Sequence, residues 1–168
     1  MADRFYSVTG GPGAGKTTLL RHLASLGHAV APESARAVIR AGRGRPEPNR
    51  FCELILQQDL AAYAAASGLT FFDRSLVDAW ATFRACGLAP SPAAADAVRT
   101  HRYAARAFIA PPWKAIYVRD AERDQTWAQA VATYDACAEA YLAWGYELVE
   151  LPLADVETRA AFVLEAIA

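Results

Sequence analysis

Residues 10 to 17 read Gly10-Gly11-Pro12-Gly13-Ala14-Gly15-Lys16-Thr17 and match the pattern G-x-x-x-x-G-K-[S/T]. Glycines can adopt positive φ angles, so successive backbone N–H groups can point into one concavity and bind phosphate oxygens. An apolar stretch at residues 4–9 precedes the loop, and leucines at helical spacing follow it over residues 17–26. The loop is therefore predicted to join a strand to a helix, which is the context a phosphate-binding loop requires.

A glycine-rich turn without any ligand is the alternative explanation of this segment. Such a turn would not need a lysine and a threonine at these two offsets, and so we favour the phosphate-binding interpretation. Lys16 is expected to reach the β- and γ-phosphates, and the Thr17 hydroxyl is expected to bind Mg²⁺. The predicted ligand is a purine nucleoside triphosphate, ATP, with Mg²⁺, bound by Gly10, Gly11, Pro12, Gly13, Ala14, Gly15, Lys16, Thr17 and Thr18.

Predicted strands alternate with predicted helices along the whole chain. The strands are expected at residues 4–9, 28–32, 69–73, 115–118 and 146–153, with Asn49 and Asp155 as caps of two of the helices and one long helix starting at about residue 124. Alternation of this kind is typical of an α/β fold with a parallel sheet. We therefore predict one domain over residues 1–168, a three-layer α/β/α P-loop NTPase with a five-stranded parallel sheet.

Composition narrows the class of partner. The chain has 168 residues, 54% of them hydrophobic, and a formal net charge of −1. No global field therefore draws it to nucleic acid or to an anionic membrane, and the expected partner is a small molecule. Cys52, Cys86 and Cys137 lack metal-site spacing and suit a reducing compartment. Without a leader sequence or a long apolar run, a cytoplasmic protein is expected, compatible with a homodimer.

Three classes of P-loop protein could explain this sequence: a switch GTPase, a mechanical ATPase and a kinase. A switch GTPase should carry a guanine-reading Asn-Lys-x-Asp motif, and the sequence contains none. A mechanical ATPase of the AAA+ or helicase type usually needs a longer chain with a second subdomain. The kinase interpretation is therefore preferred, and a resemblance to known kinases supports it. That resemblance implies that the region at about 76–112, which is predicted to be helical, covers the acceptor.

Two strand ends carry the resemblance to known kinases. The second predicted strand leads into Glu33-Ser34-Ala35-Arg36, and the third ends in Asp73-Arg74-Ser75. These segments resemble the deoxynucleoside kinases and the ribosylnicotinamide kinase domain of a bacterial NAD-synthesis regulator. Over essentially its whole length the chain is also similar to small bacterial proteins of the AAA-type ATPase family, including at Pro111-Pro112-Trp113, Asp120-Ala121-Glu122-Arg123 and Gly145-Tyr146-Glu147. The resemblance implies a kinase-type P-loop fold and ATP use without naming the acceptor.

The resemblance to nucleoside kinases also implies residue roles. Glu33 would face the acceptor hydroxyl as general base, with a helix-start carboxylate as the alternative. Asp73 would either join the Mg²⁺ shell through water or act as the base itself, and its structural alternative is a helix cap. Arg74 would contact the acceptor or a phosphate, or fix Glu33 through an ion pair. Arg36, behind Glu33, is equally well explained by a solvated surface position.

The resemblance to nucleotide-type kinases also implies a lid at about 119–126, directly after the fourth predicted strand. Its arginines, Arg119 and Arg123, would stabilise charge on the phosphoryl oxygens in the transition state. A surface pair neutralised by neighbouring acidic residues is the alternative. Trp113 is expected to pack in the core or the lid rather than to stack on a base. The expected activity is transfer of the ATP γ-phosphoryl group to a nucleoside-like acceptor; the alternative is a signalling ATPase without a small acceptor.

Overall fold

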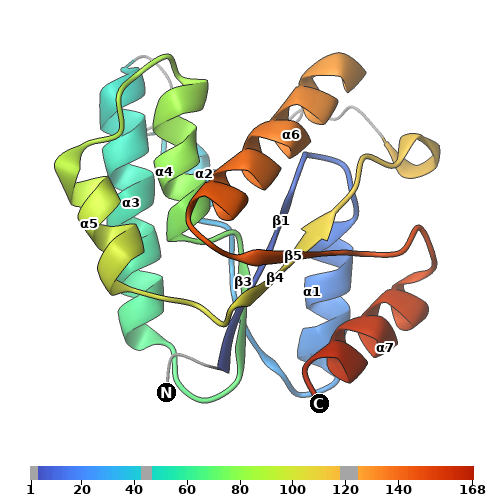
Figure 1. The fold of residues 1–168 in the computed structure, drawn as a ribbon. Helices are drawn as coiled ribbons and strands as arrows, with labels where there is room; N and C mark the ends of the chain where they lie inside the picture. The colour runs from blue at the N-terminus through green and yellow to red at the C-terminus, as the bar shows by residue number, and fades with distance from the viewer. Residues whose placement is uncertain (1–3, 43–46, 118–124) are drawn as a thin grey trace.

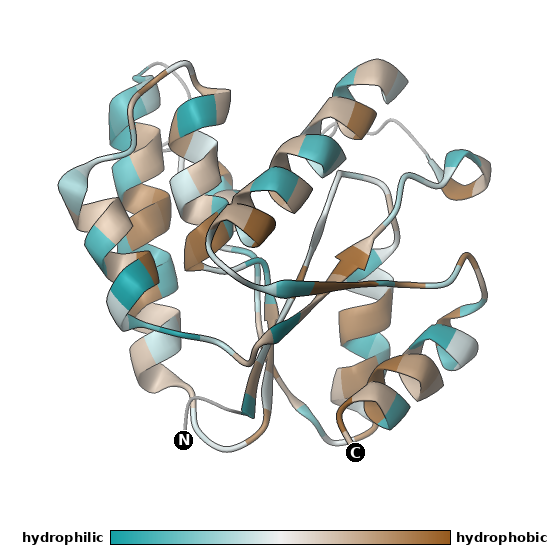
Figure 2. Cartoon of the chain, in the orientation of Figure 1, coloured by the Kyte–Doolittle hydropathy of each residue, from teal (hydrophilic) through white to brown (hydrophobic). Residues whose placement is uncertain are grey.

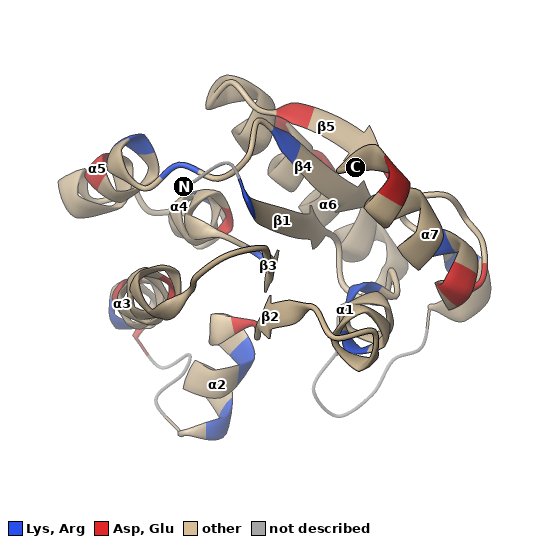
Figure 3. Ribbon diagram, turned by 90° about the horizontal axis from the view of Figure 1, so that it is seen from below, with Lys and Arg blue, Asp and Glu red and all other residues tan. Residues whose placement is uncertain are grey.

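The computed structural model describes residues 4–42, 47–117 and 125–168. Within these residues, five strands form one parallel sheet in the order β2-β3-β1-β4-β5, and the strand labels follow this order in Figure 3. The strands are β1 (Phe5–Gly10), β2 (Ala29–Ala31), β3 (Thr70–Asp73), β4 (Arg106–Ala110) and β5 (Glu147–Glu150). The predicted all-parallel sheet of five strands is confirmed.

Helices cover both faces of the sheet, as expected for a three-layer α/β/α fold (Figure 1). On one face α1 (Lys16–Ser25) packs against α7 (Val156–Ala166), and their leucine, alanine and valine side chains join one core cluster. The second cluster joins the sheet to α2 (Ser34–Arg40), α3 (Pro48–Ala65), α4 (Leu76–Ala85), α5 (Pro92–Thr100) and α6 (Trp127–Ala143). Figure 2 shows hydrophilic residues on the outer turns of these helices.

The central strand β1 contributes side chains to both core clusters. Side chains alternate across a strand, so neighbouring residues face opposite sides of the sheet. Phe5 belongs to the cluster on the α3 side, whereas Val8 is fully buried in the cluster on the α1 side. Because β1 is buried on both faces in the middle of the sheet, the loop that follows Gly10 leaves from the centre of the carboxyl edge.

The fourth strand is not where the sequence pattern placed it, and the prediction at residues 115–118 is wrong for residues 115–117, which the structure describes. Lys114–Ile116 form a 3₁₀ turn, η2, whose Ile116 is 38% exposed, and the strand is instead Arg106–Ala110. Residues Ala107 to Ala110 are buried, and Phe108 pairs with Val8 of β1. Two prolines follow Ala110, and because proline has no backbone N–H they end the ladder there.

This shift changes the predicted cover and the predicted lid. Between β3 and β4 the helices α4 and α5 end at Thr100, and so the region at about 76–112 is helical only in part. The lid segment does not follow β4 directly, because η2 lies between them.

The helix caps also differ in detail from the expectations. Helix α3 begins at Pro48 after Glu47, and Asn49 is therefore inside the helix. Helix α6 begins at Trp127 with Thr126 as its cap. Asp155 caps α7 as predicted, accepting a hydrogen bond from the Thr158 N–H at 2.7 Å. Among the helices of the described segments, none combines the length and the apolar character needed to cross a membrane.

Candidate active site

The phosphate-binding loop connects β1 to α1 at the carboxyl edge of the sheet. Gly13 and Gly15 have φ angles of +71° and +79°, which favour glycine. A Cβ atom on Gly13 would also lie 2.6 Å from the Tyr117 ring. No side chain caps the N-terminus of α1, which begins at Lys16. The unpaired N–H groups and the helix dipole together make this terminus suitable for an anion.

Lys16 is folded back onto the loop. Its Nζ donates hydrogen bonds to the carbonyl oxygens of Gly11 at 2.6 Å and Gly10 at 3.2 Å, and the residue is 7% exposed. Burial, together with the positive charge of Arg74, lowers the pKa of Lys16 to about 8. A polyphosphate beside Lys16 would favour its charged form, because an opposite charge nearby stabilises the ammonium.

Asp73 lies at the end of β3, beside the loop strand. Its Oδ1 is buried and has no hydrogen-bond partner in the described residues. Burial and the nearby charge of Glu33 raise the pKa of Asp73, although Lys16 and two arginines oppose the rise. A buried acceptor oxygen without a partner is suited to a water ligand of Mg²⁺, a cation that often binds through one or two carboxylates plus phosphates. Thr17, half-buried on the first turn of α1, would be the direct ligand.

Glu33 and Arg74 form a charge-assisted pair between two strand ends. Arg74 Nε donates to Glu33 Oε1 at 3.0 Å, and Arg36 Nε donates to Glu33 Oε2 at 2.8 Å. Burial would raise the pKa of Glu33, but Arg74, Lys16 and Arg36 outweigh it and lower this pKa to about 2. Glu33 is therefore ionised at every pH in the physiological range, and the ion pair with Arg74 that was one of the sequence alternatives is present.

Asp78 binds the Arg74 guanidinium at a second point, and the sequence analysis did not identify this residue as part of the site. Its Oδ1 accepts from Arg74 Nη1 at 3.1 Å and from the Thr9 hydroxyl at 2.5 Å. Its Oδ2 accepts from the Tyr141 hydroxyl and the Ser75 N–H at 2.6 and 2.9 Å. The sequence signal was Ser-x-x-Asp at residues 75–78, a capping box. Ser75 caps α4, so the helix-cap alternative for Asp73 is wrong.

A second overlooked carboxyl, Asp59, lies on α3. It is 8% exposed and accepts a hydrogen bond from the Ser34 hydroxyl at the start of α2. Burial raises the pKa of Asp59 to about 8, although the Ser34 hydrogen bond acts in the opposite direction. Asp59 follows Phe51 and Ile55 at intervals of four residues, so all three share one face of α3. No charged motif marks this position in the sequence.

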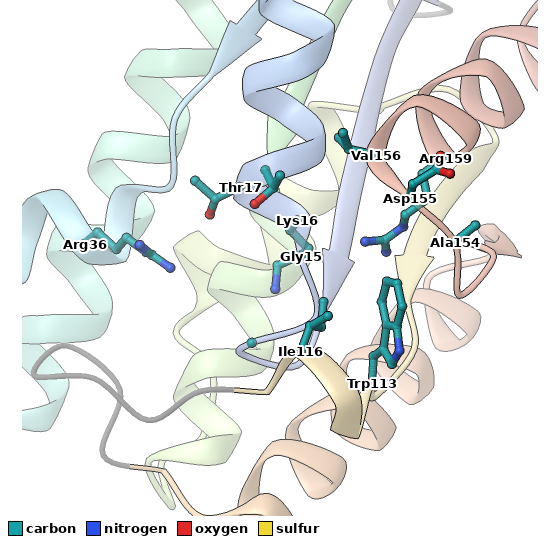
Figure 4. A pocket seen from close by; sticks show the side chains of 12 residues that line it. Gly15, Lys16, Thr17, Arg36, Trp113, Ile116, Ala154, Asp155, Val156 and Arg159 are labelled. Atoms are coloured by element: carbon teal, nitrogen blue, oxygen red, sulfur yellow. The ribbon is translucent and has the colours of Figure 1, made fainter.

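Two cavities meet at the loop. The first has a volume of about 410 Å³ and is lined by the loop, the first turn of α1, Trp113, Ile116 and the start of α7. Arg159 of α7 points into this region, facing Trp113, as Figure 4 shows. Its Nη1 donates to the Ala14 carbonyl at 3.0 Å. Trp113 is thus half-buried beside the loop and not in the core, which was one of the two places expected for it.

The second cavity has a volume of about 760 Å³ and lies among α2, α3, α4 and α6. Polar groups occupy its end near the loop, and apolar groups line the remainder. Its lining includes Glu33, Arg36, Asp59, Arg74 and Asp78 together with Ile39, Phe51, Ile55 and Ala79. The structure therefore brings together Lys16, Glu33 and Arg74 as the sequence predicted, with Asp73 beside them. Arg119 and Arg123 lie outside the described residues.

The sheet order and the loop give the chain a kinase-type P-loop NTPase fold. Residues 5–159 match the family model described as AAA domain, and the chain belongs to that family. No curated protein matches the sequence.

Three solved structures with the same fold illustrate the similarity. The NadR protein in complex with NR has a TM-score of 0.76 and 19% identity, covering 98% of this chain and 50% of its own. Shikimate kinase from Acinetobacter baumannii in complex with shikimate has a TM-score of 0.66 and 15% identity, covering 97% and 91%. Thymidylate kinase from Ehrlichia chaffeensis has a TM-score of 0.64 and 15% identity, covering 98% of both chains. The chain spans about half the length of the NadR protein.

Proposed function

We propose that this protein is an ATP-dependent phosphotransferase that moves the γ-phosphoryl group of ATP to a hydroxyl of a small, nucleoside-like acceptor. The observation that carries the proposal is the junction of two cavities at Lys16, one lined by the phosphate-binding loop and the other by Glu33, Arg74 and Asp78. A nucleotide in the first cavity and an acceptor in the second would place donor and acceptor on opposite sides of one lysine.

The reaction would exchange one P–O bond for another. The acceptor oxygen forms a bond to the γ-phosphorus as the bond between that phosphorus and the β–γ bridging oxygen breaks. ADP leaves, and the hydroxyl proton is released through a nearby carboxylate or the transferred phosphate. Catalysis of this kind depends mainly on positioning and on stabilisation of charge spread over the phosphoryl oxygens.

The two carboxylates divide between two roles in this proposal. Glu33 lines the larger cavity, is ionised, and is fixed by two arginines, which supports a role in accepting a hydrogen bond from the acceptor hydroxyl and so orienting it. Its pKa of about 2 makes it a weak base, so its role in taking the hydroxyl proton rests on the resemblance to nucleoside kinases. Asp73 lines neither cavity and carries a buried oxygen without a partner in the described residues, which supports a place in the Mg²⁺ shell. Mg²⁺ would supply charge neutralisation on the β- and γ-phosphates.

The choice of a nucleoside-like acceptor rests on the resemblance at the strand ends and on the kinds of proteins that share the fold. The NadR and shikimate kinase structures contain NR and shikimate, and a third neighbour is a thymidylate kinase. The larger cavity has room for a molecule of that size, and its apolar wall at Phe51 and Ile55 suits a ring system.

The experiment is an ADP-release screen with nucleosides, nucleotides, polyols and aminoglycoside-type alcohols as acceptors, run with the wild-type protein and with Lys16→Ala. An acceptor should raise ADP release well above the basal rate in the wild type alone. Slow ADP release that no acceptor stimulates would instead support the signalling ATPase. Near wild-type turnover in Lys16→Ala would exclude the loop assignment itself.

A further inference from the structure

The boundary between the two cavities is marked by two cationic side chains. Among the described residues, only Lys16 and Arg36 line both cavities. Figure 4 shows both side chains pointing into the same region, Lys16 from the start of α1 and Arg36 from α2. Lys16 is the motif lysine of the loop, whereas Arg36 ends the kinase-like segment Glu33-Ser34-Ala35-Arg36 and is equally well explained by a solvated surface position.

Local structure fixes the direction of Arg36. It lies three residues after Glu33, so the two side chains share one face at the start of α2. The hydrogen bond from Arg36 Nε to Glu33 Oε2, at 2.8 Å, holds the guanidinium in place, and its side chain is 29% exposed. Its positive charge also lowers the pKa of Glu33 and opposes the rise in that of Asp73. Arg36 therefore contacts Glu33 directly, and its charge acts on both predicted active-site carboxylates.

The chemistry of the proposed reaction requires positive charge at this boundary. A γ-phosphoryl group that leaves the nucleotide cavity and enters the acceptor cavity crosses between them with negative charge on its three equatorial oxygens. A planar guanidinium can donate parallel hydrogen bonds to two such oxygens, which an ammonium cannot do in the same geometry. Lys16 and Arg36 line both cavities and therefore lie at the boundary that the proposed transfer would cross.

On this basis, and resting on the proposed function, we propose that Arg36 is a further catalytic residue that contacts the transferring phosphoryl group. In this role it acts from within the fold, independently of the predicted lid arginines. The alternative is a positioning role, in which Arg36 does no more than hold Glu33 through their shared hydrogen bond. The two roles differ in whether Arg36 still matters after the Glu33 carboxylate has been removed.

The test measures the affinity for MgADP in the absence and in the presence of aluminium fluoride, which occupies the place of the transferring phosphoryl group. No acceptor is needed, and the readout is binding. The variants are Arg36→Ala, Arg36→Lys and the same changes in a Glu33→Gln background. Arg40→Ala is the matched control, because Arg40 lies one turn further along α2 and lines neither cavity. Circular dichroism confirms the fold of each variant.

In the wild type and in Arg40→Ala, aluminium fluoride should tighten MgADP binding. In Arg36→Ala that tightening should fall at least about tenfold, while the affinity for MgADP alone changes less than about threefold, because the interaction is made mainly in the transition state. The loss should persist in the Glu33→Gln background, and Arg36→Lys should recover only part of it.

Full tightening in Arg36→Ala would overturn the inference, and so would a loss that disappears once Glu33 is replaced. Tightening that is absent from the wild type, despite MgADP binding, would overturn the inference and leave the acceptor screen to decide the proposed function. A wild-type protein that does not bind MgADP would refute the proposed function and the inference together.

Discussion

Arg74 Nε donates a hydrogen bond to Glu33 Oε1 at 3.0 Å, which joins the end of β3 to the start of α2. Arg74 has a φ angle of +73°, a left-handed backbone conformation that is uncommon for any residue other than glycine. Its N–H donates to the Val8 carbonyl at 3.0 Å, and its guanidinium reaches Asp78 at 3.1 Å. Strained backbone of this kind persists where the surroundings fix it, and such positions cluster at functional sites.

The first prediction concerns Glu33. Glu33→Gln should lower turnover by about 10²-fold or more, the usual scale for a positioned acid or base. The amide keeps the size of the side chain but loses the negative charge that pairs with two arginines. Steady-state kinetics with the acceptor found in the screen would measure the effect. Unchanged turnover and unchanged acceptor affinity would show that Glu33 is no more than a helix-start residue.

The second prediction concerns Asp73. Asp73→Asn should lower turnover by about 10²-fold or more, and it should raise the Mg²⁺ concentration needed for half-maximal activity. The reason is that its buried Oδ1, which has no partner in the described structure, is the atom that would accept from a metal-bound water. A titration of activity against Mg²⁺ at saturating ATP separates the two effects. A normal Mg²⁺ requirement with reduced turnover would favour the rival role of Asp73 as the base.

The third prediction follows from the pKa of Lys16, which burial and Arg74 lower to about 8. Below that pH the free protein carries the ammonium that a polyphosphate needs, and above it the ammonium is progressively lost. The affinity for MgADP should therefore fall as the pH rises above about 8, with protons taken up on binding. Calorimetry in buffers of different ionisation enthalpy measures the uptake. Lys16→Arg stays charged and should show no such decline.

Predictions from the sequence were correct where a local pattern of residues is compatible with only one structure. The phosphate-binding loop, the strand ends at Glu33 and Asp73, and the parallel sheet all follow from local patterns that the tertiary structure preserves. The prediction of the fourth strand was wrong because residues 106–110 and 115–118 are both short apolar runs. Only pairing with β1, which requires the whole sheet, selects the former.

Tertiary packing also explains why the sequence did not assign roles to two residues at the cavities. Arg36 and Asp59 lie on α2 and α3, where a charged residue in a helix usually means a solvated face. Their proximity to the cavities depends on how these helices pack beside the carboxyl edge, and this cannot be read from either segment alone.

The fourth prediction concerns the lid arginines Arg119 and Arg123, whose proposed role is supported by the sequence alone. Arg123→Ala should lower turnover strongly and nucleotide affinity by a smaller factor, because the charge that it meets develops mostly in the transition state. The same change at Arg119 should have the smaller effect, since Arg119 could face outward. Kinetics on both single variants, with nucleotide affinity measured separately, would check this. If neither quantity moves in either variant, the two arginines are a surface pair.

The last prediction concerns Asp59, whose pKa burial raises to about 8 from an ordinary value of 3.8. A carboxyl with a raised pKa binds its proton more tightly in the folded state than in the unfolded chain. Its contribution to stability is therefore fully present below pH 3.8 and is lost progressively as the pH rises through about 8. Asp59→Asn cannot ionise. The difference in free energy of unfolding between Asp59→Asn and the wild type should therefore shift in favour of the variant as the pH is raised from 4 to 8.

Urea denaturation at several pH values would measure this difference, and comparing the two proteins cancels the titration of groups they share. Ser34→Ala is the matched variant, because the Ser34 hydroxyl donates to Asp59 and so lowers its pKa. Removing that hydrogen bond should raise the pKa of Asp59 further, so that the loss of stability still begins near pH 3.8 but continues to higher pH and becomes larger in total. Parallel pH profiles for the wild type and Asp59→Asn would mean that Asp59 titrates normally, and that water reaches its carboxyl despite the packing of α2 against α3.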